Sequence, residues 1–161
     1  MAHNGQKGMY TKQKEIIRKS WSQVGDLQDL GRQIFIRYFS EFPERSRLFR
    51  YTAGKPGAEL EKENNMGVRC HGAKVLTIFD EGVKHLDDLS PMLHNLTTLG
   101  EAHVHWKTQP DYFREMRDVF VLTLRDYLNL NEEAVRAWYV FYDVLTRAII
   151  EGILPEEDHH D

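Results

Sequence analysis

The sequence has a single cysteine and no long apolar run, and each scarcity removes a class of protein. Cys70 alone can form no internal disulfide, which agrees with a reducing compartment. No stretch reaches the roughly 18 apolar residues that a membrane span needs. We therefore expect neither a secreted domain held together by disulfides nor a chain that spans a membrane.

Blocks of positive charge are also missing. The chain has 21 Lys and Arg against 25 Asp and Glu, a net charge of −4 that is spread along its length. Without a basic block or the basic and aromatic pattern of single-strand binders, we expect no nucleic acid partner. Residues 1–10 lack the apolar core of a secretory signal, and Ala2 excludes N-myristoylation, so we expect a cytoplasmic location.

Strand signals are nearly absent, whereas helical periodicity runs through the chain. Apolar residues recur at steps of three and four, which predicts six main helices plus a small turn or helix at 43–49. Ser90 is the expected N-cap of the fourth helix, and 51–65 is expected to be a loop. The six expected helices are Thr11–Val24, Leu27–Phe42, Val68–Leu86, Ser90–Trp106, Phe113–Tyr127 and Asn131–Ile149.

These helices predict an all-α fold whose helices pack irregularly rather than as an up-and-down bundle. At 161 residues the chain fits one domain. We place that domain at 11–153, between a disordered N-terminal tail at 1–10 and a polar C-terminal tail at 154–161.

Two of the eight histidines lie on apolar helical stripes. His71 shares its stripe with Val68 and Val75, and His103 follows Leu99 on the next helix. A single histidine on such a face is usually a core imidazole bonded to a backbone carbonyl. Two on consecutive helices require two partners, because burial removes the hydration of each ring.

A metal between the two histidines would satisfy both, and the number of ligands favours haem iron. Structural zinc needs four donors and catalytic zinc usually three, whereas the chain offers two well-placed imidazoles. Cys70 is poorly aimed, because successive helical residues point about 100° apart, and we interpret it as a buried or partly exposed inert thiol. Haem iron needs one imidazole from the protein, with a second optional.

A series of motifs resembles, in order, those of the globin family, from Trp21 to about Ile149. Each motif is loose by itself, but their order and spacing are specific. They are Trp21 in the first helix, FPERSRLF with Phe49 six positions after Pro43, HGAKV around His71, LGEAHVHW around His103, and Pro110 with Phe113, followed by AWYVFY with Trp138.

The resemblance implies a globin fold around haem b. It implies that His103 is the proximal iron ligand and that His71, on the distal side, either stabilises a gas or acts as a sixth ligand. Lys74 is implied to reach a haem propionate, although a solvated lysine is an open alternative. The further residues implied to line the haem, each of which could instead be ordinary core, are Phe35, Phe49, Val75, Leu99 and Phe113.

The function implied is reversible binding of dioxygen, carbon monoxide or nitric oxide, for oxygen storage or transport. The chain resembles animal intracellular globins such as neuroglobin and cytoglobin, in which both histidines bind the iron. A bis-histidyl redox protein, a gas or redox sensor, and an enzyme that converts nitric oxide, nitrite or peroxide are therefore alternatives. Sustained redox cycling would need an external reductase. A helical interaction domain without haem is the last alternative.

Overall fold

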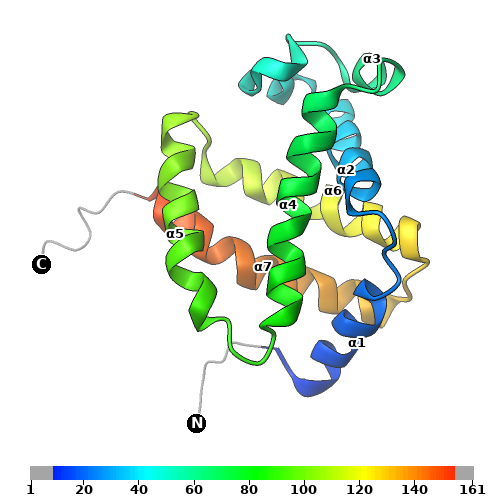
Figure 1. Cartoon of the computed structure of the whole chain (residues 1–161), viewed down its shortest axis with the longest axis vertical. Coiled ribbons are helices and arrows are strands. Elements are labelled where there is room, and N and C mark those ends of the chain that lie inside the picture. Colours follow the sequence, from blue (N-terminus) through cyan, green and yellow to red (C-terminus); the bar gives the residue numbers. More distant parts are fainter. Residues whose placement is uncertain (1–8, 155–161) are drawn as a thin grey trace, which may run out of the picture.

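The structure, a computed structural model, describes residues 9–154 and is helical along most of that length (Figure 1). No strand occurs in the described part, so the all-α prediction is confirmed. Of the predicted tails at 1–10 and 154–161, residues 1–8 and 155–161 lie outside the described residues. The elements are α1 (Thr11–Trp21), α2 (Leu27–Glu41), η2 (Pro43–Leu48), η3 (Arg50–Thr52), α3 (Gly57–Lys62), α4 (Met66–Lys84), α5 (Ser90–His105), α6 (Pro110–Leu128) and α7 (Glu132–Ile153), where η marks a 3-10 helix.

Three helices begin at side-chain caps. Asp26, Asn65 and Asn131 each accept a hydrogen bond from the backbone N–H three residues later, which starts α2, α4 and α7. Such a cap satisfies one of the free N–H groups at a helix start. Pro43 follows the end of α2 and opens η2, because its ring disfavours helical geometry in the residue before it.

Six long helices are confirmed, but three local expectations are wrong. The expected loop at 51–65 contains the short helix α3, in which Leu60 is fully buried. The first helix ends at Trp21 rather than Val24. Ser90 is the first residue of α5 and not its N-cap, which is Leu89, and the N–H of Ser90 donates to the carboxylate of Asp88.

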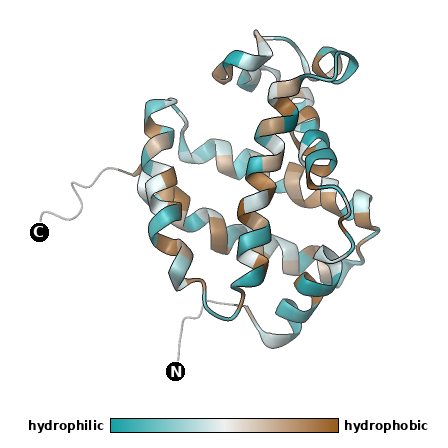
Figure 2. Cartoon of the chain, viewed as in Figure 1, coloured by the Kyte–Doolittle hydropathy of each residue, from teal (hydrophilic) through white to brown (hydrophobic). Residues whose placement is uncertain are grey.

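The core lies where α6 and α7 pass behind α4 and α5 (Figure 1), and hydrophobic residues, brown in Figure 2, occur along each of these helices. Trp138 is fully buried and packs on Trp21 at a ring distance of 5.5 Å. Both indole N–H groups are satisfied, by Ser20 and by Asp80 respectively. None of the helices in residues 9–154 is long and apolar enough to cross a membrane.

Two helix crossings depend on glycine. A methyl group on Gly72 of α4 would come within 2.7 Å of the carbonyl oxygen of Gly31 of α2. Where α5 crosses α7, a methyl group on Gly100 would lie 2.9 Å from the carbonyl carbon of Ile149 and 3.0 Å from Cα of Gly152. All three distances are shorter than ordinary van der Waals contact, so the two helix backbones touch directly at each crossing.

Candidate functional site

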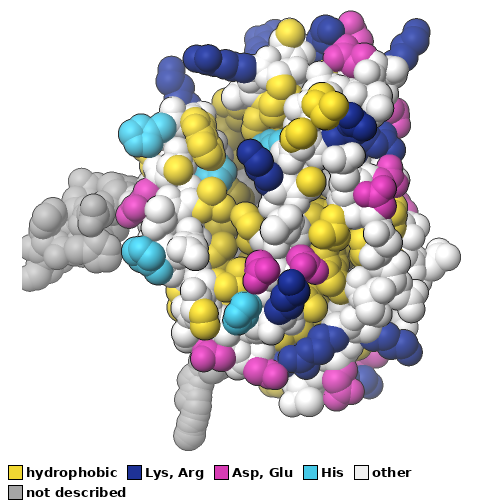
Figure 3. All heavy atoms as spheres, viewed as in Figure 1, with side chains coloured by type: hydrophobic (Ala, Val, Ile, Leu, Met, Phe, Trp, Pro, Cys, Tyr) yellow, Lys and Arg dark blue, Asp and Glu magenta, His cyan; other side chains and the backbone are white. Residues whose placement is uncertain are grey.

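The two predicted histidines lie on neighbouring antiparallel helices. His71 is on α4 and His103 on α5, and each is partly buried. Hydrophobic side chains gather over the space between these helices, and histidine side chains are visible among them (Figure 3). Helical periodicity turns both imidazoles away from the solvent faces of their helices. The structure therefore places two metal-ligating groups on facing helices in apolar surroundings.

Aromatic rings fix the plane of His71. The ring of Phe35, from α2, stacks on it with centroids 4.5 Å apart and an interplanar angle of 28°. The ring of Phe49 lies 5.1 Å away at 49°. The Tyr51 hydroxyl lies 2.8 Å from Nδ1 of the imidazole. His71 is therefore held by contacts with α2, with Phe49 between η2 and η3, and with Tyr51 of η3.

The charge state of His71 follows from its surroundings. Burial, and then the positive charges of His103 and Lys74, lower the pKa of His71 to about 4. The ring is therefore neutral at pH 7 and carries a single N–H proton. That His103 influences this pKa also means that the two imidazoles lie within electrostatic reach of each other.

His103 is anchored by its own helix. Its Nδ1 lies 2.7 Å from the carbonyl oxygen of Leu99. A carbonyl oxygen only accepts, so Nδ1 carries the proton and Nε2 keeps a free lone pair. Burial lowers the pKa of His103, which favours this neutral form. Phe113 and Trp106 meet the ring edge-on at 5.4 and 4.7 Å. A neutral imidazole with its proton fixed on Nδ1 can offer the lone pair of Nε2 to a metal ion.

The remaining predicted residues divide into apolar and polar positions. Val75 and Leu99 are partly buried and pack against the core, whereas Lys74 is exposed. Cys70 is also exposed, so its interpretation as a buried or partly exposed thiol is wrong. The reason is the helical turn: Val68 and Gly72 face inward, and Cys70 lies midway between them on the outer face of α4.

Sequence reasoning missed two neighbours of the histidines, Tyr51 and Trp106. Tyr51 lies outside any apolar stripe, in a segment expected to be a loop, so periodicity gave no signal for it. Trp106 directly follows the helix that carries His103, three positions from it, and that i, i+3 spacing was the available signal.

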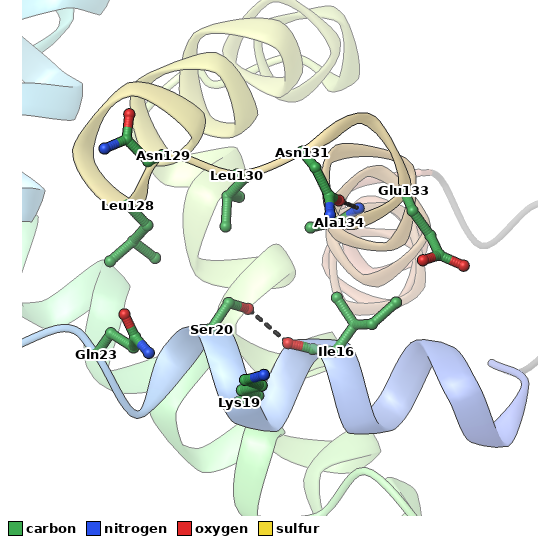
Figure 4. Close-up of a pocket in the computed structure, with 10 residues that line it drawn as sticks. All are labelled: Ile16, Lys19, Ser20, Gln23, Leu128, Asn129, Leu130, Asn131, Glu133 and Ala134. Atoms are coloured by element: carbon green, nitrogen blue, oxygen red, sulfur yellow. Dashed lines mark hydrogen bonds between the residues drawn. The ribbon is translucent and has the colours of Figure 1, made fainter.

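A cavity of about 260 Å³ lies elsewhere, between α1 and the turn from α6 to α7 (Figure 4). Its polar groups form hydrogen bonds within and between the helices and so stabilise the fold. The hydroxyl of Ser20 donates to the carbonyl of Ile16 and accepts from the indole of Trp138, and Asn131 caps α7. In the described residues no group of three or more His, Cys, Asp or Glu side chains could hold a metal ion. The paired histidines are therefore the better candidate site.

Comparison with known proteins identifies the family. The model of the globin family matches residues 32–149, which is most of the chain. The chain is a globin. The helices that carry His71 and His103 both lie inside the matched region.

Several known globins resemble this one along almost their full length. The larval haemoglobin subunit beta-1 of Xenopus laevis is 30% identical over 142 residues, covering 87% of this chain and 94% of that protein. A neuroglobin of Chaenocephalus aceratus is 30% identical over 144 residues, covering 88% and 90%. The solved structure of a Drosophila melanogaster globin has a TM-score of 0.80 at 22% identity, covering 89% and 94%, and supports the fold.

The site of this globin fits the haem that its family binds. The lone pair on Nε2 of His103 supplies the one protein donor that haem iron requires. Phe35, Phe49, Val75 and Phe113 add apolar and aromatic surface near the two histidines, as a large flat hydrophobic group requires. The globin is therefore a haem-binding protein, and the role of each residue at the haem remains a prediction.

Proposed function

We propose that this globin binds haem b between α4 and α5 and uses it to bind dioxygen, or another diatomic gas, reversibly for storage or transport. The observation that carries the proposal is the pair of neutral imidazoles on facing helices. His103 has its proton on Nδ1, bonded to Leu99, and so presents a lone pair. His71 is held opposite by aromatic rings and a tyrosine hydroxyl.

The haem supplies the iron at which a diatomic gas binds. His103 holds that group from the proximal side, and its bond to the Leu99 carbonyl keeps the ring from turning. His71 faces the distal side and offers an N–H group to a polar ligand. Phe35 and Phe49 exclude water around it, which strengthens that hydrogen bond and protects the site from oxidation.

Lys74 has a separate proposed role at the edge of the haem. Its side chain is exposed, yet its charge contributes to the lowered pKa of His71. A flexible lysine so close to the distal imidazole suits a haem propionate, because the pairing keeps the ammonium group in water.

The second candidate is a bis-histidyl haem protein that acts as a redox protein, a sensor or a nitric oxide or nitrite enzyme with an external reductase. The influence of His103 on the pKa of His71 favours it, since the two rings lie within electrostatic reach of each other. A solved Drosophila melanogaster protein of the same fold is described as a hexa-coordinate haemoglobin, at 23% identity and a TM-score of 0.78. The two candidates differ in whether Nε2 of His71 carries a proton or binds iron.

Absorption spectra test the proposal. We expect purified protein to give a strong Soret band that shifts when the reduced form binds carbon monoxide. The His103→Gly variant should lose most of its haem, the His71→Gln variant should keep haem but release gas faster, and the exposed His94→Gln variant should match the unchanged protein. Full haem retention in His103→Gly would contradict the assignment.

A second measurement distinguishes an oxygen carrier from an enzyme. For a carrier, we expect repeated oxygenation and deoxygenation with little oxidation, and slow turnover of nitrite or nitric oxide with excess reductant. Fast, sustained turnover in the presence of an electron donor would support the second candidate instead.

A further inference from the structure

Tyr51 is the one polar side chain of the described residues that is hydrogen-bonded to the distal imidazole. Its hydroxyl oxygen lies 2.8 Å from Nδ1 of His71, and the two rings meet edge-on at 5.9 Å. We propose that Tyr51 is a positioning residue, which donates its hydroxyl proton to Nδ1 of His71 and so holds the imidazole as the tautomer with its proton on Nε2. The meaning of this N–H group for gas binding rests on the proposed function, but the tautomer itself does not.

Tyr51 is fixed by contacts with the start of α4. The side-chain amide of Asn65 donates to the backbone carbonyl of Tyr51 at 3.0 Å, while its oxygen caps α4 through the N–H of Val68. The tyrosine ring lies on Gly67, where an added methyl group would come within 2.6 Å of Cδ1. Gly67 precedes His71 by one helical turn, so backbone and ring together direct the hydroxyl towards the imidazole.

The direction of the hydrogen bond follows from the acceptors on hand. The hydroxyl of Tyr51 has no other hydrogen-bond partner among residues 9–154. If Nδ1 carried the proton and donated to Tyr51, the phenolic proton would be left without an acceptor in a partly buried place. Leaving such a proton unpaired disfavours that arrangement on the order of tenfold. The imidazole nitrogen is therefore the acceptor.

No other orientation of the His71 ring keeps the hydrogen bond between Nδ1 and Tyr51. Phe35 stacks on one side of it and Phe49 packs against it, and a flip about Cβ–Cγ would put Cδ2 in the place of Nδ1 and leave Tyr51 unpaired. A neutral imidazole has one proton to place on its two nitrogens. With Nδ1 used as acceptor, that proton sits on Nε2.

The tautomer decides between the two roles proposed for His71. An N–H on Nε2 donates a hydrogen bond to a polar gas, whereas a metal ligand needs a lone pair on the same atom. Tyr51 therefore favours gas stabilisation and opposes the use of His71 as a second axial ligand. The chain sets this preference through a residue that lies 20 positions before the histidine.

Nitrogen-15 NMR of histidine-labelled protein tests the tautomer directly. Long-range proton–nitrogen spectra are recorded on the full chain, both as the diamagnetic carbon monoxide complex of the haem-loaded protein and without haem. The His71→Gln variant identifies the signals of His71. We expect one imidazole nitrogen of the unchanged protein to carry the proton, and that nitrogen to be Nε2. A proton on Nδ1 would overturn the proposal.

Three variants test the role of Tyr51. Tyr51→Phe keeps the ring but removes the donor, and Gly67→Ala displaces the ring, so both should give a mixture of tautomers. Tyr139→Phe is the matched control, because it removes a hydroxyl that bonds to Asp118 on α6. Unchanged His71 signals in folded Tyr51→Phe would refute the role, and the spectrum of the unchanged protein decides the tautomer even if a variant fails to fold.

A second readout uses the reduced, haem-loaded protein. Without gas, Tyr51→Phe should raise the ratio of iron bound by His71 to iron not bound by it on the order of tenfold, seen as sharper split visible bands. With carbon monoxide, its C–O stretch should rise in frequency, because the hydrogen bond from Nε2 weakens. An unchanged ratio and frequency would contradict the inference. Failure to take up haem would instead contradict the proposed function, and the spectra without haem would still report the tautomer.

Discussion

The glycine crossing between α2 and α4 predicts that a single methyl group will perturb the distal side. In Gly72→Ala the new methyl group would lie 2.7 Å from the carbonyl oxygen of Gly31 and 2.8 Å from its Cα. Both contacts are with backbone, so no side-chain rotation relieves them. The helices must separate by about 1 Å before the contacts become ordinary.

The magnitude follows from that displacement. Adding a methyl group to a tightly packed contact destabilises a protein by about 1–3 kcal/mol. For a chain of this size such a loss lowers the melting temperature by about 2 to 12 °C. His71 directly precedes Gly72 on α4, so its stacking on Phe35 at 4.5 Å should loosen as well.

The assay compares thermal unfolding of the haem-loaded, carbon monoxide form by circular dichroism, with gas release rates measured on the same samples. The matched control is Gly25→Ala, because no atom lies within 4 Å of a methyl group at Gly25. We expect the control to melt like the unchanged protein. Equal melting temperatures for the two variants would show that the crossing tolerates separation and would refute the steric reasoning.

Two further predictions concern other contacts. Arg45 donates two hydrogen bonds to Glu115, and these bonds lower the pKa of that carboxyl. Glu115→Gln should therefore reduce the free energy of unfolding at pH 7, measured by urea denaturation, by about 1–2 kcal/mol. Because the pKa is lowered in the folded state, this stabilisation is fully present above the unfolded pKa and is lost as the pH falls through the lower folded pKa; a deficit that stayed constant as the pH fell would be inconsistent with it, and Glu132→Gln, at an exposed position, is the control. Gly100→Ala should push α5 away from Ile149, again at about 1–3 kcal/mol, and increase haem loss to apomyoglobin; unchanged haem loss would contradict it.

Much of the fold was predictable because helical periodicity is a local signal. Six long helices, the stop before Pro43 and the inward positions of His71 and His103 all follow from spacing along the chain. Short α3 was missed since two turns of helix, stabilised by the burial of Leu60, leave almost no periodic trace. The N-cap of α5 was misplaced by one residue, because a proline costs no intrahelical hydrogen bond at either of the first two helical positions and Pro91 stands at the second.

The sequence predicted which two histidines form the candidate site, but not all of the contacts that hold their rings. Phe35 and Phe49 could be placed near His71 through the family resemblance. The hydrogen bond of Tyr51 could not, because it depends on Asn65 and Gly67 fixing the short 3-10 helix η3 against α4. Sequence spacing orders side chains within one element, whereas contacts between elements depend on the fold.

The docking of α5 on α7 links haem affinity to local motion. Through Gly100 and Gly152, α5 rests closely on α7, and that crossing is its one extensive contact with another helix of the described residues. A helix held from one side opens more easily than the rest of its domain. Haem bound through His103 would hold α5 from the other side too, so it would slow amide exchange along α5. Cofactor affinity and the opening free energy of α5 are then thermodynamically linked, so a mutation that makes α5 open more easily should also weaken haem binding.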